Sequence, residues 1–146
     1  MTSTPTPAPS VQRVLYRSKA KRIGGAPLAP RDVAAIVDTS VRNNRSCGLS
    51  GILLKVDDTF IQLVEGEQRA IEATFERICV DERHSDLVLI DMITAETRLF
   101  PEWSMAHVGS DADPMRLQVN RDLKEISFTV ETHPEAALKQ MRALLR

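Results

Sequence analysis

The stretch LSGILLKVDDTFIQLVEG, residues 49–66, decides the fold. Its two halves, 49–56 and 59–66, are rich in apolar and β-branched residues, and Asp57-Asp58 separates them. Two strand-like runs joined by two turn-forming residues predict a β-hairpin with a short acidic turn. We expect the other elements of the chain to be arranged around this hairpin.

The segments on either side of the hairpin alternate between strand and helix patterns. The predicted elements, in chain order, are a strand at 11–20, a helix from Pro30 to about Asn44, the two hairpin strands, a helix at 67–80, and strands at 87–93 and 99–108. Both helices carry an apolar stripe that must be buried. One mixed β-sheet with both helices on a single face buries these stripes economically, which predicts a ferredoxin-like α+β sandwich.

The pattern is less regular after residue 109. Residues 115–126 fit a helix, whereas 126–130 equally fit a short strand, and the sequence does not decide between them. Thr132 and Glu135 have the spacing of a capping box, which predicts a final helix. These C-terminal helical elements are too short to fold alone, so we expect them to cover the open face of the sheet.

The domain organisation follows from these elements. Residues 1–10, MTSTPTPAPS, have the composition of a disordered tail and lack the apolar stretch of a signal peptide. We expect one domain at 11–108 and a helical extension at 109–146 that packs on its sheet. Fewer than forty residues follow the predicted domain, too few for an enzymatic output domain.

The composition argues against several classes of protein. The formal net charge is -1 and aromatic residues make up only 4%, so a nucleic-acid partner is not expected. No apolar run approaches the length of a membrane span. Cys47 and Cys79 lack metal-site spacing, as do the three histidines, so we expect no metal and two reduced thiols in a cytoplasmic protein.

Polar side chains stand where the strand and helix patterns call for apolar ones. Gln62 lies in the middle of a predicted strand, Tyr16 lies on another, and Asn43-Asn44 closes the first helix. A buried amide needs hydrogen-bond partners, and each residue taken alone has an ordinary explanation: a bond to a neighbouring element, core packing, or a helix cap. Together, on one side of a sheet, they favour a bound polar ligand.

Several separated motifs resemble those of the BLUF domain, the blue-light sensor that uses FAD. The similarity covers about residues 12–108. The motifs, in the family's order, are Tyr16-Arg17-Ser18-Lys19-Ala20, Ser40 to Asn44 leading into Leu49-Ser50-Gly51-Ile52-Leu53-Leu54, Phe60-Ile61-Gln62-Leu63-Val64-Glu65-Gly66, Asp81-Glu82-Arg83-His84-Ser85, and Arg98-Leu99-Phe100-Pro101-Glu102-Trp103-Ser104-Met105. The resemblance implies a flavin held between the two helices.

The resemblance also implies a role for individual residues. Tyr16 would donate an electron and a proton to the photoexcited flavin, and Gln62 would rearrange its hydrogen bonds between Tyr16 and the flavin N5 and O4 atoms. The remaining implied roles are Asn44 as a hydrogen-bond partner of the flavin C4 carbonyl, Arg83, His84, Asn43 and Ser40 near the pyrimidine side of the ring, and Ile36 and Ile78 as apolar walls. Trp103 and Met105, on one face of the last strand, would report the switch to the surface.

The leading hypothesis is therefore a blue-light photoreceptor that binds FAD non-covalently and is not an enzyme. Its output would reach a downstream protein partner or change its own association, and a homo-oligomer is expected. The alternative is a light-independent interaction module on the same fold that has lost flavin. A small hydrolase ranks last, because no nucleophile lies beside a base.

Overall fold

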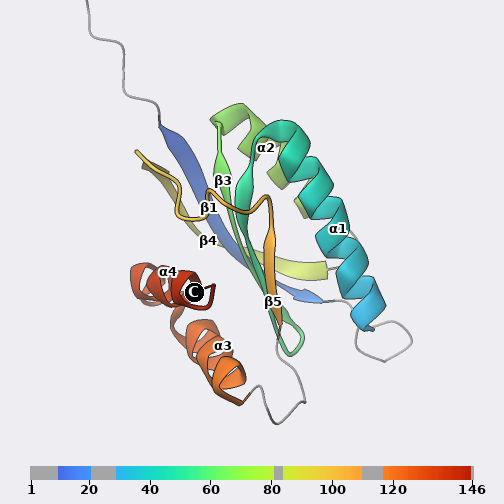
Figure 1. Ribbon diagram of the computed structural model, residues 1–146, viewed down its shortest axis with the longest axis vertical. Coiled ribbons are helices and arrows are strands. Elements are labelled where there is room, and N and C mark those ends of the chain that lie inside the picture. Colours follow the sequence, from blue (N-terminus) through green and yellow to red (C-terminus); the bar gives the residue numbers. More distant parts are fainter. Residues whose placement is uncertain (1–9, 21–28, 81–83, 110–116, 146) are drawn as a thin grey trace, which may run out of the picture.

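The computed structural model describes residues 10–20, 29–80, 84–109 and 117–145. Figure 1 shows a central sheet with helices on both of its sides. The elements, in chain order, are β1 (Val11–Ala20), α1 (Pro30–Cys47), β2 (Ser50–Val56), β3 (Thr59–Gly66), α2 (Gln68–Cys79), β4 (His84–Ala95), β5 (Ala106–Gly109), α3 (Leu117–Thr129) and α4 (Pro134–Ala143). The predicted mixed sheet and ferredoxin-like α+β fold class are confirmed.

The five described strands have the order β4-β1-β3-β2-β5. β1 pairs antiparallel with both β3 and β4, β2 pairs antiparallel with β3, and β5 runs parallel to β2. The predicted hairpin is β2–β3, and its turn residue Asp57 adopts a positive φ of 53°. Asp tolerates this left-handed conformation better than most residues, and such turns match the twist of the paired strands.

Side chains alternate between the two faces of the sheet, so each face has its own core. Figure 1 shows α1 and α2 on one side of the sheet and α3 and α4 on the other. The first core contains Val14, Leu53, Phe60, Val64 and Ile71, with α1 and α2 over it. The second core lies beneath α3 and α4. Its fully buried members are Ile52, Leu54, Ile61, Leu63, Phe100, Leu123, Ile126, Val130, Ala137 and Met141. The C-terminal helices thus cover the other face of the sheet.

The first helix begins as predicted and ends later. Pro30 occupies its first turn, and the Asp32 carboxylate accepts a hydrogen bond of 3.1 Å from the Ala29 amide. The helix continues past Asn44 to Cys47, because Gly48 with φ of 71° supplies the left-handed C-cap. Asn44 is therefore inside the helix, and its interpretation as the cap is wrong.

In the C-terminal half, the structure settles one open alternative and departs from the predictions at two places. Residues 117–129 form a helix, so the strand alternative at 126–130 is not adopted. His133 is the N-cap of α4, and the Thr132 hydroxyl donates instead to the Thr129 carbonyl, so the predicted capping box does not form. The last strand is β5 alone: residues 99–105 are irregular, because Pro101 lacks an N–H and the Leu99 and Phe100 amides bond to Glu65.

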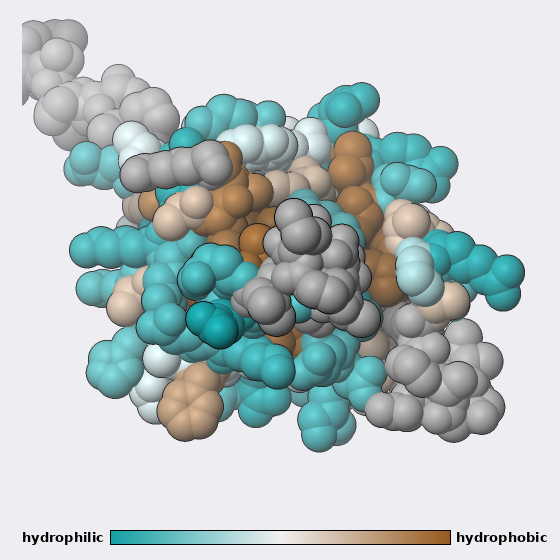
Figure 2. All heavy atoms as spheres, turned by 60° about the horizontal axis from the view of Figure 1, so that its bottom comes forward, coloured by the Kyte–Doolittle hydropathy of each residue, from teal (hydrophilic) through white to brown (hydrophobic). Residues whose placement is uncertain are grey.

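The surface is largely hydrophilic in the view of Figure 2, where apolar residues are visible mainly in the recesses between polar side chains. Across the described ranges, no helix combines the length and the apolar character needed to cross a membrane.

Candidate functional site

Tyr16 and Gln62 lie directly opposite each other on β1 and β3, the neighbouring strands at the centre of the sheet. Opposite residues of an antiparallel pair share a face, and here both side chains point toward the α1–α2 side. Both are buried, and the Tyr16 hydroxyl donates a hydrogen bond to the Gln62 carbonyl oxygen. The strand register therefore brings together the two residues singled out in the sequence.

The other end of the Gln62 amide meets Met105. The amide nitrogen of Gln62 lies 3.8 Å from the Met105 sulfur, to which it donates. A thioether is a weak acceptor, so the donor end of this buried amide is held less firmly than its acceptor end. The contact with Met105 can be exchanged at little cost, because a stronger acceptor would replace a weak one.

Asn44 reaches the same region from α1. Its side chain is only 2% exposed, and its nitrogen donates to the Ser104 carbonyl at 2.6 Å. This bond ties α1 to the segment that carries Met105. Ser40 and Asn43 are half-buried on the same helix, nearer its surface.

Apolar side chains surround this polar group. The Phe75 ring of α2 packs edge-on against Tyr16, with 5.7 Å between the ring centroids and an interplanar angle of 75°. Ile36 of α1 and Ile78 of α2 are half-buried and pack against the same core. The donors and acceptors of Tyr16, Gln62 and Asn44, within such walls, have the chemistry to hold a flat apolar ring with polar atoms on one edge.

The cavity between α2 and the sheet is small, about 10 Å³. It is lined by Val14, Tyr16, Val64, Ile71, Thr74, Phe75 and Ile78. A volume of this size accommodates about one water molecule. A ring system can enter only where the side chains of α1 and α2 move apart, and the half-buried Ile36 and Ile78 are the apolar groups it would cover.

Two of the predicted site residues are not placed. Arg83 lies outside the described residues, and of His84 only the backbone is described, at the start of β4 opposite Ala20. The structure therefore neither brings them to Tyr16 nor separates them from it.

Trp103 and Met105 differ from the prediction that they share one face of the last strand. Both precede β5, in the irregular part of the chain, where side chains do not alternate as they do in a strand. Met105 is buried in the core beneath α1 and α2. Trp103 packs against the opposite core, beneath α3 and α4. The two side chains thus point to opposite faces of the sheet.

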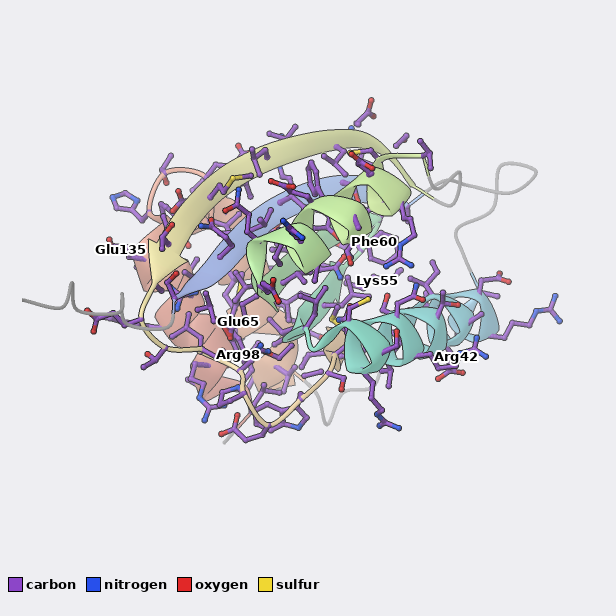
Figure 3. The ribbon with its side chains drawn as sticks, turned by 90° about the horizontal axis from the view of Figure 1, so that it is seen from above. Arg42, Lys55, Phe60, Glu65, Arg98 and Glu135 are labelled. Carbon is purple, nitrogen blue, oxygen red and sulfur yellow. The ribbon has the colours of Figure 1, made fainter. Side chains whose placement is uncertain are left out.

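A buried carboxylate that the sequence analysis missed holds this irregular segment. Glu65 is fully buried, and its two oxygens accept the Leu99 and Phe100 amides at 2.8 and 2.7 Å. Arg13 lies 3.7 Å away, and Arg98 donates to the Gly48 carbonyl at 2.7 Å. Figure 3 shows Glu65 and Arg98 near one another at the sheet. An acidic residue inside the apolar run FIQLVEG was the signal that could have found it.

The fold and the buried Tyr16–Gln62 pair are those of a small sensory domain. Comparison with known proteins agrees. The sequence model of the family BLUF, described as sensors of blue-light using FAD, matches residues 11–106. This chain belongs to the BLUF family, and blue-light sensing through a flavin is the function that membership gives it.

Relatives extend the similarity to longer proteins. The chain is 34% identical over 91 residues to the photoactivated adenylate cyclase subunit beta of Euglena gracilis. The aligned region covers 62% of this chain and 10% of that protein. The chain thus spans about a tenth of the length of the curated relatives it matches.

Solved structures show the same fold. The dark-state structure of BlrB, a BLUF protein, aligns with a TM-score of 0.75 at 26% identity, covering 93% of this chain and 98% of that one. The photo-activated state of BlsA aligns with a TM-score of 0.73 at 23% identity, covering 90% and 94%.

Proposed function

We propose that this chain senses blue light with non-covalently bound FAD and switches by rearranging the hydrogen bonds of Tyr16 and Gln62. The observation that carries the proposal is the buried bond between these two side chains, on adjacent central strands. Family membership supports a flavin, and we propose FAD because the family's description names it.

When bound, the flavin supplies absorption of blue light and an acceptor for one electron. Tyr16 is the residue suited to donate that electron, because a phenol is oxidisable and its hydroxyl becomes a strong acid once oxidised. Its proton lies on the bond to the Gln62 carbonyl oxygen, so the two groups respond together. The electron and the proton would then return to Tyr16, so no covalent change would remain.

Gln62 then provides the lasting signal. An amide has one donor end and one acceptor end, and rotation or tautomerisation exchanges what it offers in each direction. Its donor end now faces the weak acceptor Met105. After reorientation this end is free to donate elsewhere, and the contact with Met105 changes with it. The changed contact biases the irregular segment that precedes β5.

The other proposed flavin contacts come from both helices. We assign Asn44 to a carbonyl on the ring edge, Asn43 and Ser40 to neighbouring polar atoms, and Ile36 and Ile78 to the apolar ring faces. The burial of Asn44 and the half-buried isoleucines support these assignments. Arg83 and His84 are proposed near the pyrimidine side on the strength of the sequence motif alone.

We propose output through protein contacts and no enzymatic activity in this chain. Strand β4 lies at one edge of the described sheet and exposes Val88, Leu89, Met92 and Ile93. The positions of these four residues along β4 are symmetric about the point between residues 90 and 91. If β4 of a second copy paired antiparallel with this strand about that point, Leu89 would lie opposite Met92 of the other copy, and Val88 opposite Ile93. Sedimentation of the wild type and of Leu89→Lys tests this proposed homo-oligomer.

A cytoplasmic location and an unidentified downstream protein partner complete the proposal. Cys47 and Cys79 are unpaired and exposed, which fits a reducing compartment.

The experiment that tests the proposal compares flavin content and light response. The wild type and Tyr16→Phe are purified in full, supplied with FAD or FMN in separate samples, and their visible spectra are recorded before and after blue light. We expect the wild type to retain FAD preferentially and to show a small reversible red shift, and Tyr16→Phe to retain flavin without the shift. A red shift in Tyr16→Phe would refute the role of this hydroxyl, and a protein that takes up neither flavin would favour the light-independent interaction module.

A further inference from the structure

The C-terminal helix contacts the segment preceding β5 through one arginine. The Arg142 guanidinium carbon lies 5.3 Å from the centroid of the Trp103 ring and 5.9 Å from that of Phe100. Its two terminal nitrogens donate to the Glu102 carboxylate at 2.9 and 3.3 Å. One side chain of α4 therefore contacts three residues of a single turn.

This geometry suits arginine in particular. The planar guanidinium can stack on an aromatic face while its fork of N–H groups binds a carboxylate with two hydrogen bonds. Glu102 is exposed, and the hydrogen bond from Arg142 is the main cause that lowers its pKa below the usual value of 4.5. The pair is therefore ionised at neutral pH. A lysine would keep the charge and lose both the stacking and the fork.

The same turn is connected to Gln62 by a short series of contacts. Gln62 contacts the Met105 sulfur, and the adjoining Ser104 carbonyl accepts the Asn44 amide. The Trp103 carbonyl accepts a bond of 3.2 Å from the Gly51 amide of β2. Because Met105 and Trp103 are separated by one residue and pack on opposite faces of the sheet, a displacement at Met105 must be accommodated by the backbone that carries Trp103.

We propose that Arg142 is a positioning residue that holds the Trp103 indole on the α3–α4 face and connects the Gln62–Met105 contact to α4. The light-dependent half of this inference rests on the proposed function. Reorientation of the Gln62 amide displaces Met105, the backbone from 103 to 105 shifts, and the indole leaves Arg142. The released end of α4 is then the part of the chain that presents the signal.

The test uses the intrinsic fluorescence of Trp103, which is the single tryptophan of the chain. Acrylamide quenching, corrected for fluorescence lifetime, measures how accessible its indole is. The proteins are the full chain loaded with FAD, the variants Arg142→Ala, Arg142→Lys and Glu102→Gln, and the control Lys139→Ala at an exposed position of the same helix. Each is measured in darkness and after blue light, with circular dichroism as the check of folding.

A cation stacked on a solvent-accessible face of a ring shifts the balance between the held and released indole by a factor of about two to five. In darkness, we therefore expect quenching to rise about twofold or more in Arg142→Ala and Arg142→Lys, to rise less in Glu102→Gln, and to stay unchanged in Lys139→Ala. In the wild type, light raises quenching toward the value of Arg142→Ala, and light adds little in that variant.

Equal dark quenching in the wild type and both folded Arg142 variants would overturn the positioning role. A wild type that shows the red shift without any change in quenching would overturn the connection to the switch. A wild type without a red shift contradicts the proposed function instead, and the comparison in darkness still decides whether Arg142 positions Trp103.

Discussion

Replacing Glu65 should loosen the segment that carries Trp103 and Met105. The carboxylate is fully buried and accepts the Leu99 and Phe100 amides at 2.8 and 2.7 Å. A hydrogen bond to a charged group contributes about 1.5–3 kcal/mol, and a buried N–H left without a partner costs about 1–3 kcal/mol. Glu65→Ala removes both acceptors at once, so we expect the free energy of unfolding to fall by about 3–5 kcal/mol.

Glu65→Gln is the more informative variant. It keeps one oxygen acceptor and turns an NH₂ group toward the second amide, so we expect a loss of about 2–3 kcal/mol. It also leaves Arg13, whose side chain is 11% exposed and lies 3.7 Å from Glu65, without its nearby negative charge. The matched control is Glu131→Gln, an exposed carboxylate that pairs with Arg17, for which about 0–1 kcal/mol is expected.

Urea unfolding at neutral pH, followed by circular dichroism, measures these differences. A typical domain of this size has a total stability of about 5–15 kcal/mol, so the Glu65 effects are readily resolved. If Glu65→Gln loses no more stability than Glu131→Gln, the carboxylate does not anchor residues 99–105 and the reasoning fails.

Three further predictions address packing, close approach and pH. Met141→Ala should lower the free energy of unfolding by about 2–5 kcal/mol, because Met141 is fully buried in the core beneath α3 and α4. Urea unfolding measures this loss, and a value below about 1 kcal/mol would contradict that packing. Gly51→Ala should prevent normal folding or lower the free energy of unfolding by several kcal/mol, because an added Cβ would lie 2.0 Å from the Leu63 carbonyl oxygen. An unchanged melting temperature would refute this close approach. The pKa of Glu102 is lowered in the folded protein, so its pairing with Arg142 contributes stability above the usual value of 4.5, and this contribution is lost as the pH falls through the lowered pKa. Acrylamide quenching of Trp103 should therefore rise over that acidic range. In Glu102→Gln, quenching should already be raised at neutral pH and should show no such acidic step.

Much of the fold could be predicted because its elements have strong local signals. The hairpin strands are two apolar, β-branched runs on either side of two turn-forming aspartates, and the apolar stripes of the helices recur with the helical period. The predicted end of α1, at Asn44, lies too early, because the left-handed conformation that ends the helix is supplied by Gly48. Local pattern identifies such elements well and their ends less well.

The candidate site was only partly accessible to sequence reasoning. Tyr16 and Gln62 meet because β1 and β3 pair in one particular register. The alternation of side chains along each strand predicts which residues share a face, but the register itself depends on how the two strands pair. The irregular course of 99–105 depends on the Glu65 carboxylate, a long-range partner that no local window contains. Arg142 lies still further along the chain, and its contact with Trp103 depends on how α4 packs.

The central claim is that the Gln62 amide converts absorption of light into changed hydrogen bonds. Its most direct test is the light-minus-dark visible spectrum of the flavin-loaded full chain beside that of Gln62→Leu. We expect a small, reversible red shift in the wild type, and in Gln62→Leu a bound flavin whose spectrum does not shift. A normal, reversible red shift in Gln62→Leu would contradict the account, because the amide would then not be the group that switches.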